Sequence, residues 1–395
     1  MPAPQTRTDN WAKGANNVAK PERLPEGFVR HLVNLDPSAG GQLEMRAQAE
    51  QVVAATDMRL AVDMGDRVVY VDGSDLGCYS VATDSTEVIG SVDPSGEIAG
   101  VAYEGQVYLC SVRESLRTDG VSVKAWAVPA PAFSVEVIEG ALPAGIYKFA
   151  VTALGDDGEE SGTDPLIVRL VDGQAVRVTS ADSRPLRAYA SVANGATLFS
   201  QGPLIGGAMA ITVVDDSRER LTTSGLVPMP PCSMLVEYHA MIVGVCENYM
   251  VFSSPLYPHL MDPIGGFVQY SAKPSLIAPT EGGIYVVVGD KTYFVTGLDS
   301  DKPNSNKVLD LGAAGTSAVL LPDGRAAWFT RYGQAIGDST GVITLLNREN
   351  YAPDIAAIGA AGVLEHNGNS MVVTTMRGAV RPNNIATGDF ADLEM

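Results

Sequence analysis

One pattern constrains the fold of this chain more than any other: two short apolar runs joined by a turn. From residue 58 onward it recurs in MRLAVDMGDRVVYVDG, EIAGVAYEGQVYLCSV, SMLVEYHAMIVGVCENYMVFSS, LIAPTEGGIYVVVGDKTYFVTG, SAVLLPDGRAAWFTRYGQAIGD and GVLEHNGNSMVVTTMRG. Each copy predicts a β-hairpin, because Gly, Asn and Asp between apolar runs favour tight turns. The predicted tips are Met64-Gly65-Asp66, Glu104-Gly105, Gly282-Gly283, Asp323-Gly324 and Asn367-Gly368.

The composition favours a folded protein built from short strands. Of the 395 residues, 46 % are apolar and only 18 % are charged, and the chain holds 41 Gly and 24 Pro. Such a chain can bury a core, and its many turn formers break it into brief segments. In RVVYV (67–71) and QVYLC (106–110), β-branched and aromatic residues fill consecutive positions, which predicts strands covered on both faces.

Residues 131–216 differ from the repeats around them. Here apolar and polar residues alternate, and turn signals come at intervals typical of a small antiparallel sandwich. Within this segment, GIYKFAVTALGDDGEESG resembles the strand–turn–strand of fibronectin type III domains, with Tyr147, Phe149 and Val151 on one face. We therefore expect an inserted fibronectin III-like sandwich.

The remaining repeats predict an all-β fold of the β-propeller type. Six hairpin repeats share the rest of the chain at about 43 residues each, close to the length of a four-stranded blade. The predicted organisation is an extended N-terminal arm (1–50), a first propeller part (51–130), the insert (131–216) and a second propeller part (217–395). About six blades are expected, and the count could differ by one or two.

Gly337-Asp338-Ser339-Thr340-Gly341 matches the G-x-S-x-G pattern of serine hydrolases. A nucleophile elbow needs a helix after the serine, but the following TGVITLLNREN has the apolar pattern of a strand. We interpret Ser339 as part of a hairpin turn rather than as a nucleophile.

The other chemical candidates are weak as well. GDDGEESG (155–162) could offer carboxylates to Ca²⁺, but its spacing is not that of an EF-hand, so solvated charges at a hairpin tip are the favoured interpretation. CENYMVFSSPLYPHLMDP (246–263) could line a ligand groove, but a strand leading into a proline-bounded loop is the favoured interpretation. The adjacent acidic pairs Glu159-Glu160 and Asp215-Asp216 would point to opposite sides of a strand and make poor acid–base dyads.

Metal and cofactor sites are not expected. The four histidines are scattered, without zinc-ligand spacing, and no glycine loop followed by lysine offers a phosphate site. These histidines are His31, His239, His259 and His366. The four cysteines lack a C-x-x-C pair, and buried free thiols are favoured over disulfides or metal. They are Cys78, Cys110, Cys232 and Cys246. We expect no enzyme and no cofactor.

The net charge and the lack of targeting segments limit which partners and locations we expect for this protein. The net charge of −19 argues against sequence-specific binding of nucleic acid and against attachment to anionic membranes, because an acidic surface repels phosphate groups. No signal-peptide core and no apolar run of membrane-spanning length occurs in the sequence. We expect synthesis in a cytoplasm and no membrane insertion. The Asn- and Pro-rich arm cannot bury much of itself, so we expect it to lie against the body or a neighbouring chain.

The arm resembles the N-terminal arm of tail nozzle proteins of tailed bacteriophages, also called hub or stabilisation proteins. The matching positions are Gly14, Asn16, Asn17, Leu24, Pro25, Asn34, Asp36, Gly41 and Arg46. The family arm commonly ends in Arg-Arg-Pro-Gly, where this chain has EMRAQAEQ. PMPPCSMLVEYHAMIVGVCENYMVFSSP resembles a blade of the same proteins, which also tolerate inserted sandwiches.

The resemblance implies a non-enzymatic virion protein that forms a homo-oligomeric ring in the tail. Such a ring connects tail parts, among them an adaptor, fibres or a needle, and lets genomic DNA pass during ejection. An acidic channel would suit this passage, since phosphate adheres where Lys and Arg neutralise it. The resemblance assigns assembly contacts to the arm, at Asn16, Asn17, Leu24, Pro25, Asn34, Asp36 and Arg46.

Two alternatives remain open. A receptor- or carbohydrate-binding tail or baseplate module could also be built on a propeller, with aromatics clustered on one face and, for cleavage, two convergent carboxylates. Trp11, Trp126 and Trp328 are far apart in the sequence, which disfavours it. A bacterial surface scaffold is the third reading, and the missing signal peptide counts against it.

Overall fold

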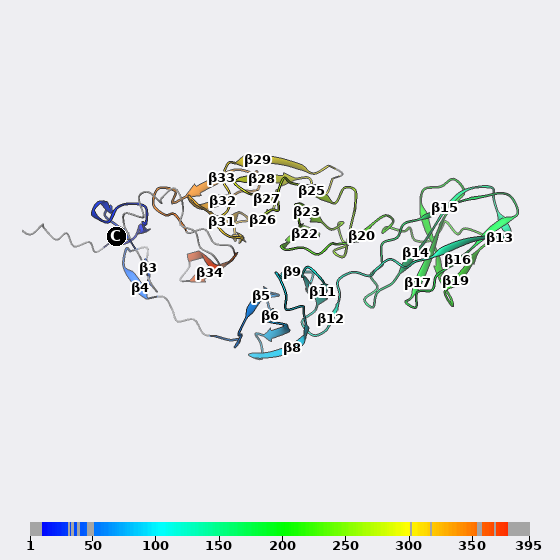
Figure 1. Cartoon of the computed structure of the whole chain (residues 1–395), viewed down its shortest axis with the longest axis horizontal. Helices are drawn as coiled ribbons and strands as arrows, with labels where there is room; N and C mark the ends of the chain where they lie inside the picture. Colours follow the sequence, from blue (N-terminus) through cyan, green and yellow to red (C-terminus); the bar gives the residue numbers. More distant parts are fainter. Residues whose placement is uncertain are drawn as a thin grey trace, which may run out of the picture. The chain divides into compact units, whose positions relative to one another are not determined.

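The computed structural model describes residues 10–30, 32, 35–37, 40–45, 51–300, 302–316, 318–353, 358–366 and 369–377 (Figure 1). Within these ranges the chain is built from strands, and the helical content is a single 3-10 turn, η1 (Pro21–Arg23). The predicted all-β fold is therefore confirmed. The chain divides into two compact units: Ala55–Gln269, called here the insert unit, and Met1–Ala54 with Tyr270–Met395, called the arm unit.

The insert unit contains three four-stranded antiparallel sheets in which neighbours follow the chain order. The first holds β5 (Met58–Asp63), β6 (Arg67–Asp72), β7 (Asp75–Ser80) and β8 (Ser85–Ser91). The second holds β9 (Ala99–Tyr103), β10 (Gln106–Cys110), β11 (Ser115–Thr118) and β12 (Val123–Ala125). The third holds β21 (Leu235–Tyr238), β22 (Met241–Cys246), β23 (Tyr249–Phe252) and β25 (Phe267–Gln269), and beside it β20 (Val227–Pro228) pairs with β24 (Leu260–Met261). The opening strands of the three sheets lie in contact, β5 with β9 and β9 with β21.

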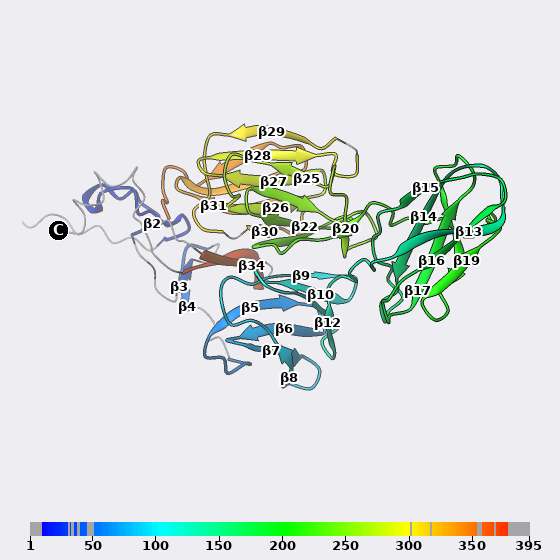
Figure 2. The same cartoon turned by 45° about the vertical axis from the view of Figure 1, so that its right-hand side comes forward.

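The arm unit repeats this organisation. One sheet holds β26 (Leu276–Thr280), β27 (Gly283–Val288), β28 (Lys291–Thr296) and β29 (Asn304–Leu309), and Figure 2 shows these strands stacked in chain order. The next holds β30 (Ala318–Leu320), β31 (Ala326–Thr330), β32 (Gly333–Gly337) and β33 (Ile343–Leu346), and a hairpin follows with β34 (Ile358–His366) and β35 (Asn369–Arg377). Here too the opening strands are in contact, β26 with β30 and β30 with β34.

The arm itself contributes two short pairs of strands to this unit. β1 (Gly14–Ala15) pairs in parallel with β2 (Phe28–Val29), and β3 (Leu35–Pro37) pairs antiparallel with β4 (Leu43–Met45). These strands have two or three residues each, so they add few ladder hydrogen bonds. The arm therefore depends on side-chain contacts for its position.

The predicted hairpin tips fall between paired strands. Glu104 and Gly105 join β9 to β10 with φ angles of 48° and 75°, the left-handed conformation at both central positions of a tight hairpin turn. The tips at Gly65, Gly282 and Gly324 also join consecutive paired strands. The tip Asn367-Gly368 lies outside the described residues, and the strands on either side of it are paired.

Sheet-to-sheet packing explains the unusually apolar strands. The central residues of β6 and all but the first residue of β10 are buried, which confirms the prediction of strands covered on both faces. Val69, Val71 and Leu109 join one core cluster between the first two sheets. At Gly100 a Cβ atom would lie 2.7 Å from a terminal methyl of Leu60 and 2.9 Å from one of Leu109, so any larger residue there would have to displace these side chains.

Between β12 and β20 the chain forms two further sheets, drawn in green in Figure 1. One has the order β13 (Ser134–Leu142), β16 (Gln174–Thr179), β19 (Ala208–Ile211), and the other β15 (Leu166–Leu170), β14 (Gly145–Ala153), β17 (Leu186–Ser191), β18 (Leu198–Pro203). Side chains of both sheets share one core cluster, so the two sheets face each other across it. Tyr147, Phe149 and Val151 lie in that core, as the alternation predicted.

Candidate functional site: the arm dock and the insert junction

Ser339 lies in the turn between β32 and β33. The Asp338 carboxylate accepts hydrogen bonds from the Thr340 amide and hydroxyl, both at 2.8 Å, and from the Val342 amide at 3.0 Å. The Thr340 hydroxyl and amide are also the main reason that the pKa of Asp338 is lowered. Because β33 is a strand, the elbow of a serine hydrolase is not formed, and the hairpin interpretation is confirmed.

Asn16 is the buried centre of the docked arm, with only 2 % of its surface exposed. Its side-chain oxygen accepts hydrogen bonds from the amides of Val18 and Ala19 at 3.1 and 2.9 Å, which closes a turn. Its amide donates to Val29 at 2.8 Å, and its side-chain nitrogen donates to the Asn350 side chain at 3.2 Å. One residue thus shapes the arm and attaches it to the loop after β33.

Asn17 makes the attachment two-sided. Its side-chain nitrogen donates to the carbonyl of Ala352, and its side-chain oxygen accepts from the amide of Ala352, both at 2.9 Å. Its own amide donates to the carbonyl of Asn350 at 3.0 Å. The Asn17 carboxamide thus hydrogen-bonds to both backbone groups of Ala352, as the backbone of a neighbouring strand would. We call Asn16, Asn17 and residues 347–352 the arm dock.

The other predicted arm residues have varied positions. Leu24 follows η1, and its amide donates to Pro21. Pro25 is exposed, and its carbonyl accepts from Phe28 at 3.3 Å. Asp36 lies in β3 opposite Glu44. Asn34 and Arg46 lie outside the described residues. Of the predicted set, Asn16 and Asn17 are brought together at the dock, and the assembly role of all seven stays a prediction.

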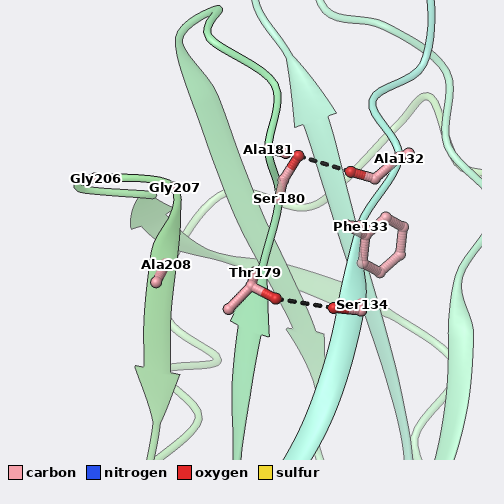
Figure 3. Close-up of a pocket in the computed structure, with 9 residues that line it drawn as sticks. All are labelled: Ala132, Phe133, Ser134, Thr179, Ser180, Ala181, Gly206, Gly207 and Ala208. Atoms are coloured by element: carbon pink, nitrogen blue, oxygen red, sulfur yellow. Dashed lines mark hydrogen bonds between the residues drawn. The ribbon is translucent and has the colours of Figure 1, made fainter.

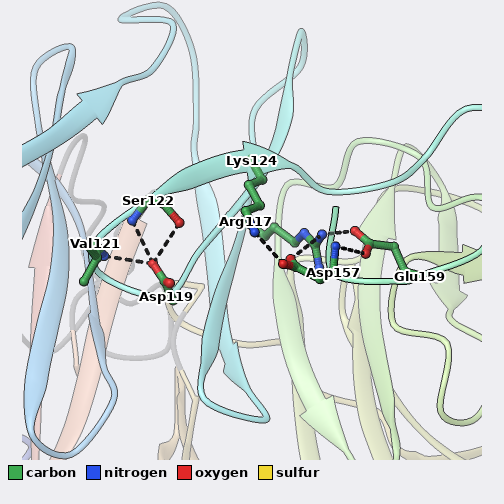
Figure 4. Close-up of polar contacts among 7 residues, drawn as sticks. All are labelled: Arg117, Asp119, Val121, Ser122, Lys124, Asp157 and Glu159. Carbon is green, nitrogen blue, oxygen red and sulfur yellow. Dashed lines mark hydrogen bonds and ion pairs between the residues drawn. The ribbon is translucent and has the colours of Figure 1, made fainter. Parts of the chain in front are cut away.

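The acidic segment 155–162 forms a junction between the inserted sandwich and the second sheet of the insert unit. Figure 4 shows Arg117 of β11 reaching the carboxylates of Asp157 and Glu159, and Lys124 of β12 reaching Asp157. The Arg117 side chain is 9 % exposed and that of Glu159 is 12 % exposed, so their charges are largely withdrawn from water. Lys124 and Asp157 are 34 % and 38 % exposed, with 2.5 Å between the charged atoms.

Glu160 extends this network into the sandwich. Its carboxylate accepts hydrogen bonds from the hydroxyls of Thr152 at 2.5 Å and Tyr189 at 2.6 Å. Burial, followed by the hydrogen bond to Glu160, raises the pKa of Tyr189. The Glu160 carbonyl lies 3.0 Å from Nε2 of His259. Since a carbonyl only accepts, Nε2 carries the proton in this contact.

His259 is 7 % exposed, and its burial lowers the pKa of the imidazole. Arg117 lowers this pKa too, whereas the Glu160 carbonyl raises it. We call Arg117, Lys124, Asp157, Glu159, Glu160 and His259 the insert junction. The prediction that segment 155–162 carries solvated tip charges holds for Asp156 and Asp157, which are exposed. It is wrong for Glu159 and Glu160, whose partly buried carboxylates bind basic and hydroxyl side chains of their own unit.

These partners could not be identified from the sequence. Arg117 and Glu159 are 42 residues apart, and Asn17 and Ala352 are 335 residues apart. Arg117 is the one charged residue of β11 and is buried there, but a single arginine in a strand does not by itself indicate a junction. The proline-rich stretch 246–263 is structural: Trp126 donates from its indole nitrogen to the carbonyl of Pro258 at 3.0 Å.

The cysteines are free, and Cys78, Cys110 and Cys232 are buried, as predicted, while Cys246 is half-buried. Cys110 lies against the backbone of Cys232, 3.0 Å from its carbonyl oxygen and 3.2 Å from its amide nitrogen. This contact joins the second and third sheets of the insert unit within a shared core cluster. Its role is packing.

A shallow groove of about 530 Å³ lies at one end of the three-stranded sheet of the sandwich (Figure 3). The hydroxyls of Ser134 and Thr179 bind each other at 2.8 Å, and the Ser180 hydroxyl donates to Ala132 at 2.6 Å. The groove is lined by small and hydroxyl-bearing residues, and none of its lining side chains is charged. Nothing in it forms an acid–base or nucleophile–base pair.

The part of the chain that the structure describes holds neither a metal-ligand cluster nor a membrane-spanning helix. No cluster of three or more His, Cys, Asp or Glu side chains there could ligate a metal ion. No helix in the same residues has the length and apolar character to cross a membrane.

Comparison with known proteins places the chain in no family. No family model matches it, and no curated protein matches its sequence. Among solved structures, apo AztD from Citrobacter koseri aligns over 80 % of this chain and 75 % of its own, with 10 % identity and a TM-score of 0.33. A streptogramin B lyase aligns over 82 % and 95 %, with 8 % identity and a TM-score of 0.35. The N-terminal domain of Nup159 aligns over 80 % and 72 %, with 12 % identity and a TM-score of 0.32. Likeness at this level says nothing about activity, ligand or partner.

Proposed function

We propose that the chain is a β-propeller of about six blades with an inserted fibronectin III-like sandwich, and that it serves as a structural, non-enzymatic ring component of a bacteriophage tail. The fold proposal is supported by five four-stranded sheets with consecutive strands. In each unit the opening strands of successive sheets are neighbours, as they are around a propeller axis. The hairpin β34–β35 supplies the inner half of a sixth blade.

The insert has pairings that fit the immunoglobulin-like class of sandwich. β14 pairs with β17 and β17 with β18, which corresponds to the C, F and G strands, while β13 pairs with β16 as B pairs with E. β15 and β19 extend the two sheets at their edges. These pairings favour the fibronectin III-like description over an unrelated meander.

The observation that carries the proposed function is the arm dock. Asn16 and Asn17 are among the positions at which the arm resembles tail nozzle proteins, and they make the side-chain contacts that attach it. Since the arm has little ladder bonding of its own, this attachment orders a segment that could not fold alone. An ordered arm can present its remaining surface to a neighbouring subunit.

Charge is consistent with the passage of DNA. A net charge of −19 gives a surface that lacks the Lys and Arg needed to neutralise phosphates, so DNA would slide without adhering. Sequence-specific binding of DNA is not part of the proposal. The proposal does include contacts with other tail proteins, such as an adaptor, a fibre or a needle.

Negative-stain images and sedimentation of the purified protein test this proposal. We expect rings around a central channel, either alone or after mixing with neighbouring tail proteins, and we expect glycan arrays to give no signal. Monomers that bind glycans, and never form rings with those neighbours, would replace the proposal with the receptor-binding alternative.

A further inference from the structure

An open groove with a basic rim lies between the outer strands of two successive sheets of the arm unit. Its volume is about 530 Å³, and its lining includes Lys307 and Val308 from β29, Tyr332 from the β31–β32 turn, Leu345 from β33, and Arg348. Val308 and Leu345 also pack against the core, so the floor of the groove is fixed. Asp310 lines the groove as well, so the groove combines a rigid apolar wall with two cationic side chains and one carboxylate.

Two guanidinium groups gather at the ring of Tyr332. Arg331 lies 5.5 Å and Arg348 lies 5.4 Å from the ring centroid. Neither arginine forms a salt bridge with another described residue. Lys307 does, with Asp310 at 2.6 Å. Two arginines beside an aromatic ring, neither of them paired with a carboxylate in the described ranges, suit a ligand with carboxylates, which guanidinium binds through paired hydrogen bonds.

The turn that presents Tyr332 is firmly built. The Thr330 hydroxyl donates to the carbonyl of Gly333 at 3.0 Å and accepts from the Tyr332 amide at 3.1 Å. Gly333 has a φ of 101°, and a Cβ atom there would lie 2.4 Å from the carbonyl oxygen of Leu346, so only glycine fits. The turn that carries Tyr332 is thereby fixed at the groove before any ligand arrives.

The chain carries a segment of complementary chemistry. Residues 388–395, GDFADLEM, lie outside the described part of the chain and combine Asp389, Asp392 and Glu394 with Phe390 and Leu393. Carboxylates would meet the arginines, and the apolar side chains would meet the wall formed by Val308 and Leu345. Ten residues (378–387) separate this segment from the end of β35, enough to span at most about 36 Å.

We infer that this groove binds the acidic segment 388–395 of a second copy of the chain, and so links neighbouring subunits. The inference rests on the ring proposed above. Its position supports it further: Arg348 belongs to the loop 347–352 that also holds the arm, so subunit contact and arm attachment would share one loop.

The test uses full-length protein and a fluorescein-labelled peptide of residues 385–395. The receptor is the variant D389N/D392N/E394Q, which keeps the groove and removes the carboxylates of its own segment. We expect fluorescence anisotropy to report binding, and R331Q/R348Q in this background to weaken it at least about tenfold. The control R325Q removes an arginine paired with Asp323 at a hairpin tip and should leave the affinity unchanged. No binding, or equal binding by all variants, overturns the inference.

Mixing the two variants identifies the source of the segment. R331Q/R348Q has an intact segment, and D389N/D392N/E394Q has an intact groove, so an equimolar mixture should form dimers through one good interface while each variant alone sediments more slowly than wild type. If wild type is monomeric, rejects the peptide and the mixture stays monomeric, the segment binds its own groove and the inference is overturned. If wild type forms rings that R331Q/R348Q leaves unchanged, the inference fails while the proposed function stands.

Discussion

The arm dock and the insert junction solve the same problem with opposite chemistry. Both attach a segment that cannot hold itself in place to a body of packed sheets. The dock does so with neutral carboxamides, whose oxygens and nitrogens pair with backbone groups. The junction uses buried charges, with Arg117 between two carboxylates.

The chemistry of each attachment determines the pH and ionic strength that it can tolerate. Carboxamides do not titrate, and salt screens their hydrogen bonds little, so the arm should stay attached across a wide range of pH and ionic strength. A charged junction costs desolvation free energy, is strong when complete, and fails when one partner is lost or titrated. The arm is thus attached independently of solution conditions, and the insert is attached conditionally.

Removal of Arg117 should destabilise its attachment more than any other substitution proposed here. R117M leaves Glu159 buried without its partner, and we expect the junction to lose about 3 kcal/mol, roughly 100-fold in its opening equilibrium. Hydrogen exchange measures this loss at the amides of Gly155 and Ser161, which bond to the carbonyls of Glu159 and Ala153 in the turn that carries the junction carboxylates. The arm amides should be unaffected.

A double variant shows whether the cost comes from the unpaired charge. R117M/E159Q removes both charges and should recover part of the lost protection, because no uncompensated carboxylate remains. Equal losses in the single and double variants would mean that packing, not charge, holds the junction closed.

Loss of the Asn17 side chain should have the second-largest effect, a loss of stability at the arm dock. N17A leaves the amide and carbonyl of Ala352 without partners, at a cost of about 2 kcal/mol confined to the dock. Hydrogen exchange at the amides of Asn17 and Ala352 should rise, while the melting temperature changes little. N306A, at an exposed position of β29, is the matched control. Unchanged exchange in N17A would show that the arm is held elsewhere.

Local features of the fold followed from the sequence because their causes are local. Glu104-Gly105 predicts a hairpin, because the turn requires left-handed backbone conformations that glycine readily adopts. Tyr147, Phe149 and Val151 announce a buried face through the two-residue period of a strand. In each case the neighbours in the chain determine the outcome.

The attachments could not be predicted, since their partners are distant in the chain. Nothing near Asn17 indicates that Ala352 will lie beside it, and nothing near Glu159 indicates Arg117. Glu159 and Glu160 were misread for this reason: an exposed tip and a buried junction have the same local sequence. Charges lose their water only through tertiary packing, which the sequence alone does not display.

A pH titration of the junction should give a smaller effect than either substitution. Burial holds the pKa of His259 below 6.5 in the closed state, and opening restores its ordinary value. The open state therefore binds a proton that the closed state does not, so protection at Gly155 and Ser161 should fall as pH drops below 6.5. H259Q should remove this dependence, and the arm amides should show none. A flat profile in the wild type would mean that His259 is exposed to water while the junction is closed.

The smallest effect should come from Lys124, whose pair with Asp157 is about one-third exposed on both sides. K124Q should weaken the junction by about 0.5 kcal/mol at low ionic strength, because water and salt already screen the pair. The pKa of Asp157 is lowered chiefly by its hydrogen bond to Lys124. The ionised Asp157 therefore stabilises the closed junction above pH 3.8, and this stabilisation is lost as the pH falls through the pKa of Asp157 in the folded protein. Hydrogen exchange at Gly155 in 0.05 and 1 M salt checks this, with K148Q as the matched lysine control. The K124Q effect should vanish at high salt whereas that of N17A should persist. If both respond to salt alike, the division into a neutral dock and a charged junction is wrong.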